Sequence, residues 1–178
     1  EAPNDGWGRD STYANMTFGQ NLGITMVQTA SAFSAVVNGG TWHTPTIVAG
    51  AMKNGEFTEE SASKVTEKVS DQILTAETSA AMRDMLINNR SYKVTTGIDR
   101  PGKSGTAQVI VNGAYDDTFA QLIGSYIGFV GPSGELPKYV IMVKMWGEGQ
   151  GIGSGDAMSL FDSLSNYLID YLKIKPGT

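Results

Sequence analysis

Two strand-like apolar runs joined by a short loop constrain the fold of this chain more than any other feature. The runs cover residues 123–130 and 139–146, and the loop between them is bounded by Pro132 and Pro137. A short connection between neighbouring strands favours an antiparallel pair, because a parallel crossover needs a dozen or more residues. Together with a third strand-like run at residues 103–111, they predict an antiparallel sheet.

Three segments predict helices around this sheet. Thr25 and Thr75 are candidate N-caps for two of them, and Asp156 is the candidate cap of the last and clearest helix. The apolar positions that we expect to face the core are Met26, Ala30, Phe33 and Val37 in the first helix, Met82, Met85 and Leu86 in the second, and Ala157, Leu160, Phe161, Leu164, Leu168 and Leu172 in the third. The predicted fold class is α+β (mixed α/β), with helices flanking an antiparallel sheet.

The stretches between these elements predict less regular structure. Residues 1–20 are rich in glycine, asparagine and aspartate, and we expect an irregular entry segment there. Residues 41–57 contain the turn sequence Asn54-Gly55, which predicts extended structure with a turn. We expect residues 58–72 to form a polar connection.

The composition is typical of a globular protein and excludes several functional classes. With 178 residues, 40% of them hydrophobic and 17% charged, the chain is expected to form one domain over residues 1–178. A net charge of −5 and the lack of a Lys/Arg cluster argue against nucleic acid as a partner. The absence of cysteine excludes disulfides, thiolate nucleophiles and cysteine zinc sites. No apolar run is long enough to span a membrane, and no signal peptide is recognised.

The sequence Lys103-Ser104-Gly105-Thr106 is the main candidate for chemistry. It opens the run that predicts the first strand of the sheet, so a cation and two hydroxyl groups would lie along one strand. The edge of such a strand can hold the carboxylate and the backbone of an extended peptide. The Lys-Thr/Ser-Gly triplet is one of three motifs shared by penicillin-binding proteins and serine β-lactamases, although the triplet alone is common.

Three stretches of the chain, taken in order, resemble the C-terminal part of the transpeptidase domain of class B penicillin-binding proteins. Residues 14–20 end in Phe18-Gly19-Gln20 and precede a helix of small residues, like the Phe-Gly-Gln segment of that family. Residues 102–108 are similar to its third active-site motif. Residues 126–131, followed by residues 137–140, resemble its next two strands.

This resemblance implies a five-stranded antiparallel sheet and a D,D-transpeptidase that cross-links peptidoglycan stem peptides and is acylated by β-lactams. Lys103 would bind the carboxylate of the donor peptide and tune the charge of the site, which makes it the catalytic residue of this chain. Ser104, Gly105 and Thr106 would bind substrate, with the Thr106 N–H in the oxyanion hole. Ser104 stands where threonine is more common, and it keeps the hydroxyl. We expect no cofactor and no metal.

The same resemblance places the protein at the extracytoplasmic face of a bacterial cell membrane, anchored through an N-terminal segment that this chain lacks. The expected partners are the stem peptide, β-lactam antibiotics, the N-terminal part of the same domain and the cell-wall synthesis machinery. A role in division and a role in elongation both remain open. Because the chain opens on Glu1-Ala2-Pro3 without methionine, we expect it to be a piece of a longer protein.

The residues that would complete the chemistry are not recognised in this chain. The nucleophile of the family lies in a Ser-x-x-Lys motif on a buried helix, and the second motif is Ser-x-Asn; both precede the Phe-Gly-Gln segment. Ser61-Ala62-Ser63-Lys64 matches the first motif literally, but it follows that segment within a polar stretch, so we interpret it as a loop. Tyr13-Ala14-Asn15 imitates a variant of the second motif, and we interpret it as structural. Without a serine nucleophile, the fragment alone is expected to be inactive.

Three further features have simpler interpretations. The alternating glycines of residues 147–155 lack the spacing of a phosphate-binding loop and predict a flexible connection. Asp116-Asp117 predicts a solvated loop, because adjacent side chains point apart. His43 is the only histidine, so it cannot build a zinc site alone, and we interpret it as a structural or surface residue.

Two alternative functions remain open. A β-lactam sensor or non-catalytic penicillin-binding module would bind the drug without turnover, whereas a serine β-lactamase would hydrolyse it. The Phe18-Gly19-Gln20 segment favours the transpeptidase. We also expect an incomplete sheet, because in the family the strand like residues 139–146 lies beside strands from the N-terminal part of the domain. Removing those strands would leave an unpaired edge and bare apolar helix faces.

Overall fold

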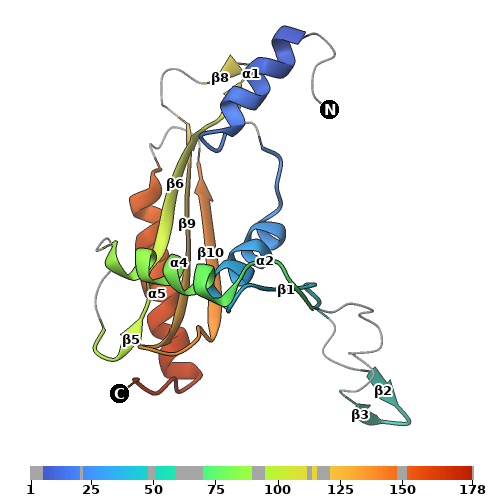
Figure 1. Ribbon diagram of the computed structural model, residues 1–178, viewed down its shortest axis with the longest axis vertical. Coiled ribbons are helices and arrows are strands. Elements are labelled where there is room, and N and C mark those ends of the chain that lie inside the picture. Colours follow the sequence, from blue (N-terminus) through green and yellow to red (C-terminus); the bar gives the residue numbers. More distant parts are fainter. Residues whose placement is uncertain are drawn as a thin grey trace.

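The computed structural model describes residues 6–20, 22–47, 51–58, 70–89, 95–111, 114–115, 121–147 and 152–177. The helices in these ranges are α1 (Gly6–Met16), α2 (Met26–Val37), α4 (Ala76–Asn88) and α5 (Ser154–Tyr171). The strands are β1 (Thr41–His43), β2 (Ala51–Lys53), β3 (Glu56–Thr58), β4 (Ser70–Gln72), β5 (Ile98–Asp99), β6 (Gly102–Gln108), β7 (Ile110–Val111), β8 (Ala114–Tyr115), β9 (Leu122–Pro132) and β10 (Tyr139–Trp146) (Figure 1). None of these helices is long and apolar enough to cross a lipid bilayer.

The main sheet is antiparallel and is built around β9. Along one edge of β9, residues 123–130 pair with β10; along the other edge, residues 122–128 pair with β6. β5 continues the β6 side and pairs with the last two residues of β9. The predicted hairpin is confirmed, and the third strand is confirmed as far as Gln108. The described part of the sheet holds four strands, fewer than the five that the resemblance implies.

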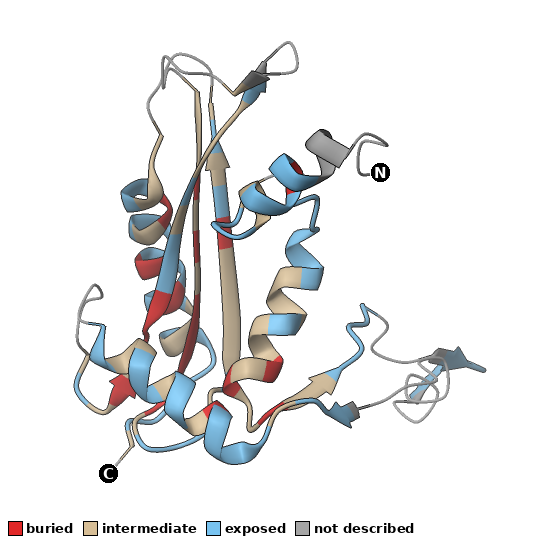
Figure 2. Ribbon diagram, turned by 45° about the horizontal axis from the view of Figure 1, so that its top comes forward, coloured by how far each residue is buried: buried red, intermediate tan, exposed pale blue. Residues whose placement is uncertain are grey.

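Helix α5 covers one face of this sheet and forms the main core with it (Figure 1). The ring of Phe161 in α5 packs against that of Tyr126 in β9, with 4.7 Å between the ring centroids. Val130 and Val143 come from β9 and β10 and are buried in the same cluster. Figure 2 shows that the buried residues follow β9 and the side of α5 that faces it.

Glycines allow α5 and β6 to approach β9 closely. A Cβ atom at Gly128 would lie 2.5 Å from the carbonyl oxygen of Pro101 and 2.7 Å from the ring of Phe161. A Cβ atom at Gly124 would lie 2.2 Å from the carbonyl oxygen of Gly153, just before α5. Both distances are far inside van der Waals contact, so this packing depends on glycine at the two positions of β9.

Helices α2 and α4 pack against each other beside the sheet, with α2 next to β10 and α4 next to β6. The buried Ser79 of α4 donates to the Val36 carbonyl at 2.7 Å and accepts the Gly39 N–H at 2.9 Å. Arg83 Nη1 donates to the Val37 carbonyl at 2.9 Å. The two α4 side chains thus satisfy backbone groups that the end of α2 leaves without helical partners.

The predicted caps of α2 and α4 are confirmed, whereas that of α5 is wrong. The hydroxyls of Thr25 and Thr75 each accept the N–H of the third residue of their helix at 3.2 Å. Helix α5 begins two residues before Asp156, which therefore lies within its first turn. Its Oδ2 accepts the Gly153 N–H at 2.9 Å, so the carboxylate caps the helix from inside.

The predicted apolar faces of the helices are only partly buried. Ala157 and Phe161 of α5 are buried, but Leu160 and Leu164 are 41% and 39% exposed. In α2, Val37 is buried while Met26 is 41% exposed, and in α4 the exposed set includes Met82 and Met85. Helical spacing identifies the apolar residues of a helix, but it does not tell which of them a neighbouring element covers.

Two expectations for the ends of elements are wrong as well. Residues 6–16 form α1 instead of an irregular segment; this helix is polar and exposes most of its described side chains, so no apolar stripe signals it. The strand expected at residues 103–111 is interrupted after Gln108, because Ile110–Val111 pairs with β8 instead of β9.

The turn at Asn54-Gly55 is confirmed, with positive φ at both residues in the hairpin of β2 and β3.

We predict that Gly128→Ala lowers the free energy of unfolding by roughly 1–3 kcal/mol, because the new methyl group would overlap the Pro101 carbonyl and the Phe161 ring. Urea unfolding followed by circular dichroism measures the change. Gly155→Ala is the matched control, since apart from its chain neighbours and the nearby backbone of its own helix no atom lies within 4 Å of a Cβ at that position. The control should be neutral or stabilising by up to about 1 kcal/mol. Equal destabilisation by the two variants would contradict the close packing.

We predict that residues 1–178 alone bind a hydrophobic dye and self-associate. Within the described residues β10 pairs only with β9, and large apolar side chains such as Trp146 and Tyr171 are 69% and 67% exposed. Unpaired strand edges and bare apolar surface promote association. Dye fluorescence and sedimentation velocity over a concentration series provide the measurement. A monomer that binds no dye would show the prediction to be wrong.

Candidate functional site

The predicted motif lies on an edge strand. The residues of β9 that lie opposite Lys103, Ser104, Gly105 and Thr106 are Ile127, Tyr126, Ser125 and Gly124, respectively. Within the described part of the chain, β6 pairs with β9 on one side only. Its other side is therefore an edge along which a further extended chain could pair.

The backbone of the motif points alternately toward β9 and toward this edge. The Pro101 carbonyl accepts the Phe129 N–H at 3.1 Å, so Pro101 faces β9. Because alternate residues of an antiparallel strand face opposite sides, Ser104 and Thr106 direct their N–H and C=O groups to the outer edge. The position of Lys103 agrees with this direction, since its Nζ donates to the Ser104 carbonyl at 2.7 Å.

The polar side chains of the motif lie on both faces of the strand. Ser104 stands opposite Tyr126, whose ring packs on α5, so Ser104 and Thr106 belong to the α5 face. Lys103 and Gly105 belong to the other face. All three polar side chains are exposed. The structure thus brings the two hydroxyl-bearing residues together on one face and places Lys103 on the opposite face of the same strand.

A hydroxyl group on β9 contacts the middle of the motif. Ser125 Oγ donates to the Gly105 carbonyl at 3.2 Å. A Cβ atom at Gly105 would lie 2.7 Å from the same Ser125 Oγ. The glycine therefore leaves room for this bond. Ser125 belongs to no motif of the sequence, and its position beside Gly105 depends on the register between β6 and β9.

An open hollow of about 550 Å³ adjoins the far end of β6 on the face opposite α5. Its walls include Ala107 of β6, Ser125 of β9 and the first turn of α2. Lys144 and Trp146 of β10 close another side, with the Lys144 Nζ 5.6 Å from the centroid of the Trp146 ring. This hollow shares the face of the sheet that carries Lys103.

The other candidates lie apart from this strand or outside the described residues. His43 is exposed in β1, which pairs with β4 in a separate two-stranded sheet. Tyr13 is exposed in α1. Residues 61–64 and residues 116–117 lie outside the described ranges, as do the glycines at 149 and 151.

Residues 2–165 match the model of the penicillin-binding protein transpeptidase domain. This chain belongs to that family. Its resemblance to class B penicillin-binding proteins is confirmed by relatives over most of its length. It is 30% identical to penicillin-binding protein PbpB of Mycobacterium tuberculosis over 94% of this chain and 26% of that protein. It is 32% identical to stage V sporulation protein D of Bacillus subtilis over 73% of this chain and 20% of that protein.

Solved structures of transpeptidase domains have the same fold. Penicillin-binding protein 3 of Mycobacterium tuberculosis, complexed with ampicillin, matches with a TM-score of 0.73 and 25% identity over 98% of this chain and 40% of that one. A peptidoglycan synthetase of Bifidobacterium adolescentis matches with a TM-score of 0.75 and 17% identity over 94% of this chain and 31% of that one. The α+β fold class is thus confirmed, and this chain spans well under two thirds of these relatives.

Proposed function

We propose that residues 1–178 form the C-terminal part of a D,D-transpeptidase domain, which cross-links peptidoglycan stem peptides by serine acyl transfer and is acylated by β-lactams. The family match over residues 2–165 supports this function, and so do the complexes of a relative with ampicillin and aztreonam. The observation that carries the proposal is the position of the Lys-Ser-Gly-Thr sequence on β6, which within the described residues pairs only with β9 and directs backbone groups away from it on the other side.

In this proposal a stem peptide or a β-lactam lies along the outer edge of β6. The Lys103 ammonium contributes positive charge for the donor carboxylate, and the hydroxyls of Ser104 and Thr106 donate hydrogen bonds to the ligand. Gly105 leaves the strand flat between them. The outward N–H of Thr106 would donate to the oxyanion, an interaction worth about 3 kcal/mol in acyl transfer.

The serine nucleophile and its lysine would come from the N-terminal part of the same domain. Residues 1–178 alone would then bind ligand weakly and form no acyl-enzyme. Because peptidoglycan lies outside the cell membrane, the complete protein would act at the extracytoplasmic face, held there by a segment beyond this chain. The cell-wall synthesis machinery is the expected partner.

We predict that Lys103→Gln lowers the rate constant of acylation by a fluorescent penicillin about 100-fold or more in the complete polypeptide that carries residues 1–178. The loss follows from removing the positive charge beside the ligand carboxylate while the strand is kept. Quenched-flow labelling followed by gel fluorescence measures the rate constant. Residues 1–178 alone should remain unlabelled.

Lys138→Gln is the matched control, because Lys138 is exposed in the turn between β9 and β10 and its Nζ lies 3.5 Å from a Glu135 carboxylate oxygen. It should change acylation by less than about twofold. Equal labelling of the Lys103 variant and the parent would contradict the assigned site. Rapid nitrocefin turnover by the parent would instead identify a serine β-lactamase, and labelling with no transfer to an acceptor amine would identify a sensor.

A further inference from the structure

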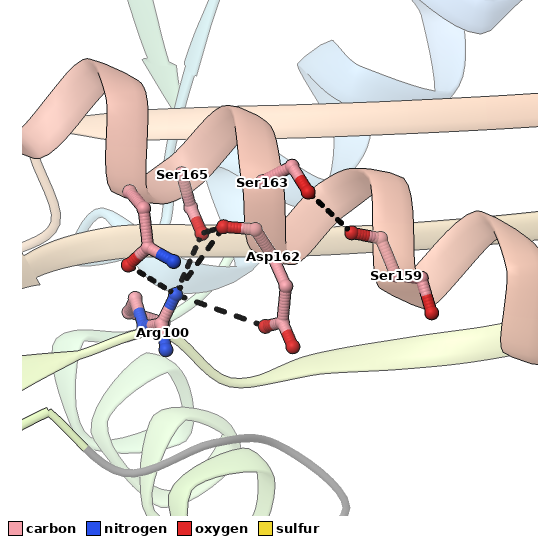
Figure 3. A network of polar contacts seen from close by, with 6 residues as sticks. Arg100, Ser159, Asp162, Ser163 and Ser165 are labelled. Carbon is pink, nitrogen blue, oxygen red and sulfur yellow. Dashed lines mark hydrogen bonds and ion pairs between the residues drawn. The ribbon is translucent and has the colours of Figure 1, made fainter.

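A buried arginine precedes the motif strand. Arg100 lies between β5 and β6, three residues before Lys103, and is 2% exposed. Figure 3 shows its side chain directed toward the part of α5 that carries Asp162 and Ser165. A buried cation is costly unless it is paired and hydrogen-bonded, so a charged side chain at this position calls for a specific explanation.

One turn of α5 provides the partners of this arginine. Arg100 Nη1 donates to Asn166 Oδ1 at 2.9 Å and to Ser165 Oγ at 3.0 Å, and it contacts the Asp162 carbonyl oxygen at 3.5 Å. The carboxylate of Asp162 lies 3.7 Å from the same nitrogen. Ser165 is fully buried and in turn donates to the Asp162 carbonyl at 3.0 Å (Figure 3). Helix α5 therefore binds the segment just before β6 through several polar contacts.

The residues that follow Arg100 are held on the other side by β9. Pro101 accepts a hydrogen bond from Phe129, and a Cβ atom at Gly102 would lie 2.4 Å from both the Ile127 carbonyl oxygen and the Tyr126 ring. A two-residue slip of β6 in either direction would replace glycine with a side chain at this contact. A one-residue slip would turn Arg100 away from α5. The arginine and the glycine thus fix the same register.

We propose that Arg100 is a positioning residue for acyl transfer. Its bonds to α5 set the register of β6 and its distance from α5, and thereby the placement of Lys103, Ser104 and Thr106. The distance along an extended strand from Arg100 to Thr106 is only about 20 Å. This inference rests on the proposed transpeptidase function. It assigns Arg100 no contact with the ligand.

Arg100→Lys is the decisive variant, because it keeps the charge and removes the Nη1 nitrogen that contacts Asn166, Ser165 and Asp162. In the complete polypeptide we expect the second-order rate constant for penicillin acylation to fall roughly 10- to 100-fold, as small displacements of reacting groups do. Arg83→Lys is the control, since Arg83 also bonds a backbone carbonyl but does so at the end of α2. We expect it to lower the melting temperature with less than about a twofold change in acylation. An equal loss of acylation in both variants overturns the proposal.

A double-variant cycle separates positioning from general stability. If Arg100 acts through the motif, the fold reduction of the acylation rate constant by Arg100→Lys should be at least about five times smaller in a Thr106→Val background than in the parent. Multiplication of the two separate effects would overturn the proposal. Should Arg100→Lys fail to fold, Ser165→Ala removes a single bond to the arginine. It should act in the same direction to a smaller extent, and unchanged acylation by that variant also overturns the proposal.

Amide hydrogen exchange of residues 102–108 distinguishes failure of this inference from failure of the proposed function. Arg100→Lys should accelerate exchange in that segment more than Arg83→Lys does, whether or not the protein reacts with penicillin. Faster exchange in a protein that is never acylated would retain the role of Arg100 in β6 and reject the transpeptidase. Unchanged exchange with normal acylation of the parent would reject the role of Arg100 alone.

Discussion

The register of β9 determines most of this structure. Two long strands and the short β5 pair with its edges, and α5 lies against the face where Tyr126 meets Phe161. Since side chains alternate along a strand, one register decides which residues face α5 and which face the open side of the sheet. The placement of the Lys-Ser-Gly-Thr sequence on β6 follows from this pairing, because it has no other strand partner among the described residues.

The parts of the fold that could be predicted are those encoded locally. The hairpin of β9 and β10, the turn at Asn54-Gly55 and the caps at Thr25 and Thr75 each depend on residues close together in the chain. Helix α1 was missed because a polar, exposed helix has no apolar period. Leu160 was assigned to the core because helical spacing does not tell which side of an amphipathic helix will be covered.

The candidate site, like the fold, could be predicted only in part from the sequence. The motif itself could be recognised from the sequence, and its position on a strand was predicted correctly. Its division between two faces, with Lys103 on one and Thr106 on the other, required the pairing register. Arg100 contacts α5, and Ser125 contacts the Gly105 carbonyl, so neither could be linked to the motif without the three-dimensional arrangement.

The paired glycines of β9 give this domain an uneven tolerance to amino-acid replacement. Gly124 faces Gly153, the residue before α5, and Gly128 faces Phe161 of α5. No larger residue fits at either site without moving the helix, so few substitutions are tolerated there. The intervening residues, such as Ser125 and Ile127, lie on the opposite face of the sheet and are less buried. A library of variants meant to keep the scaffold would therefore randomise the second set and leave the first unchanged.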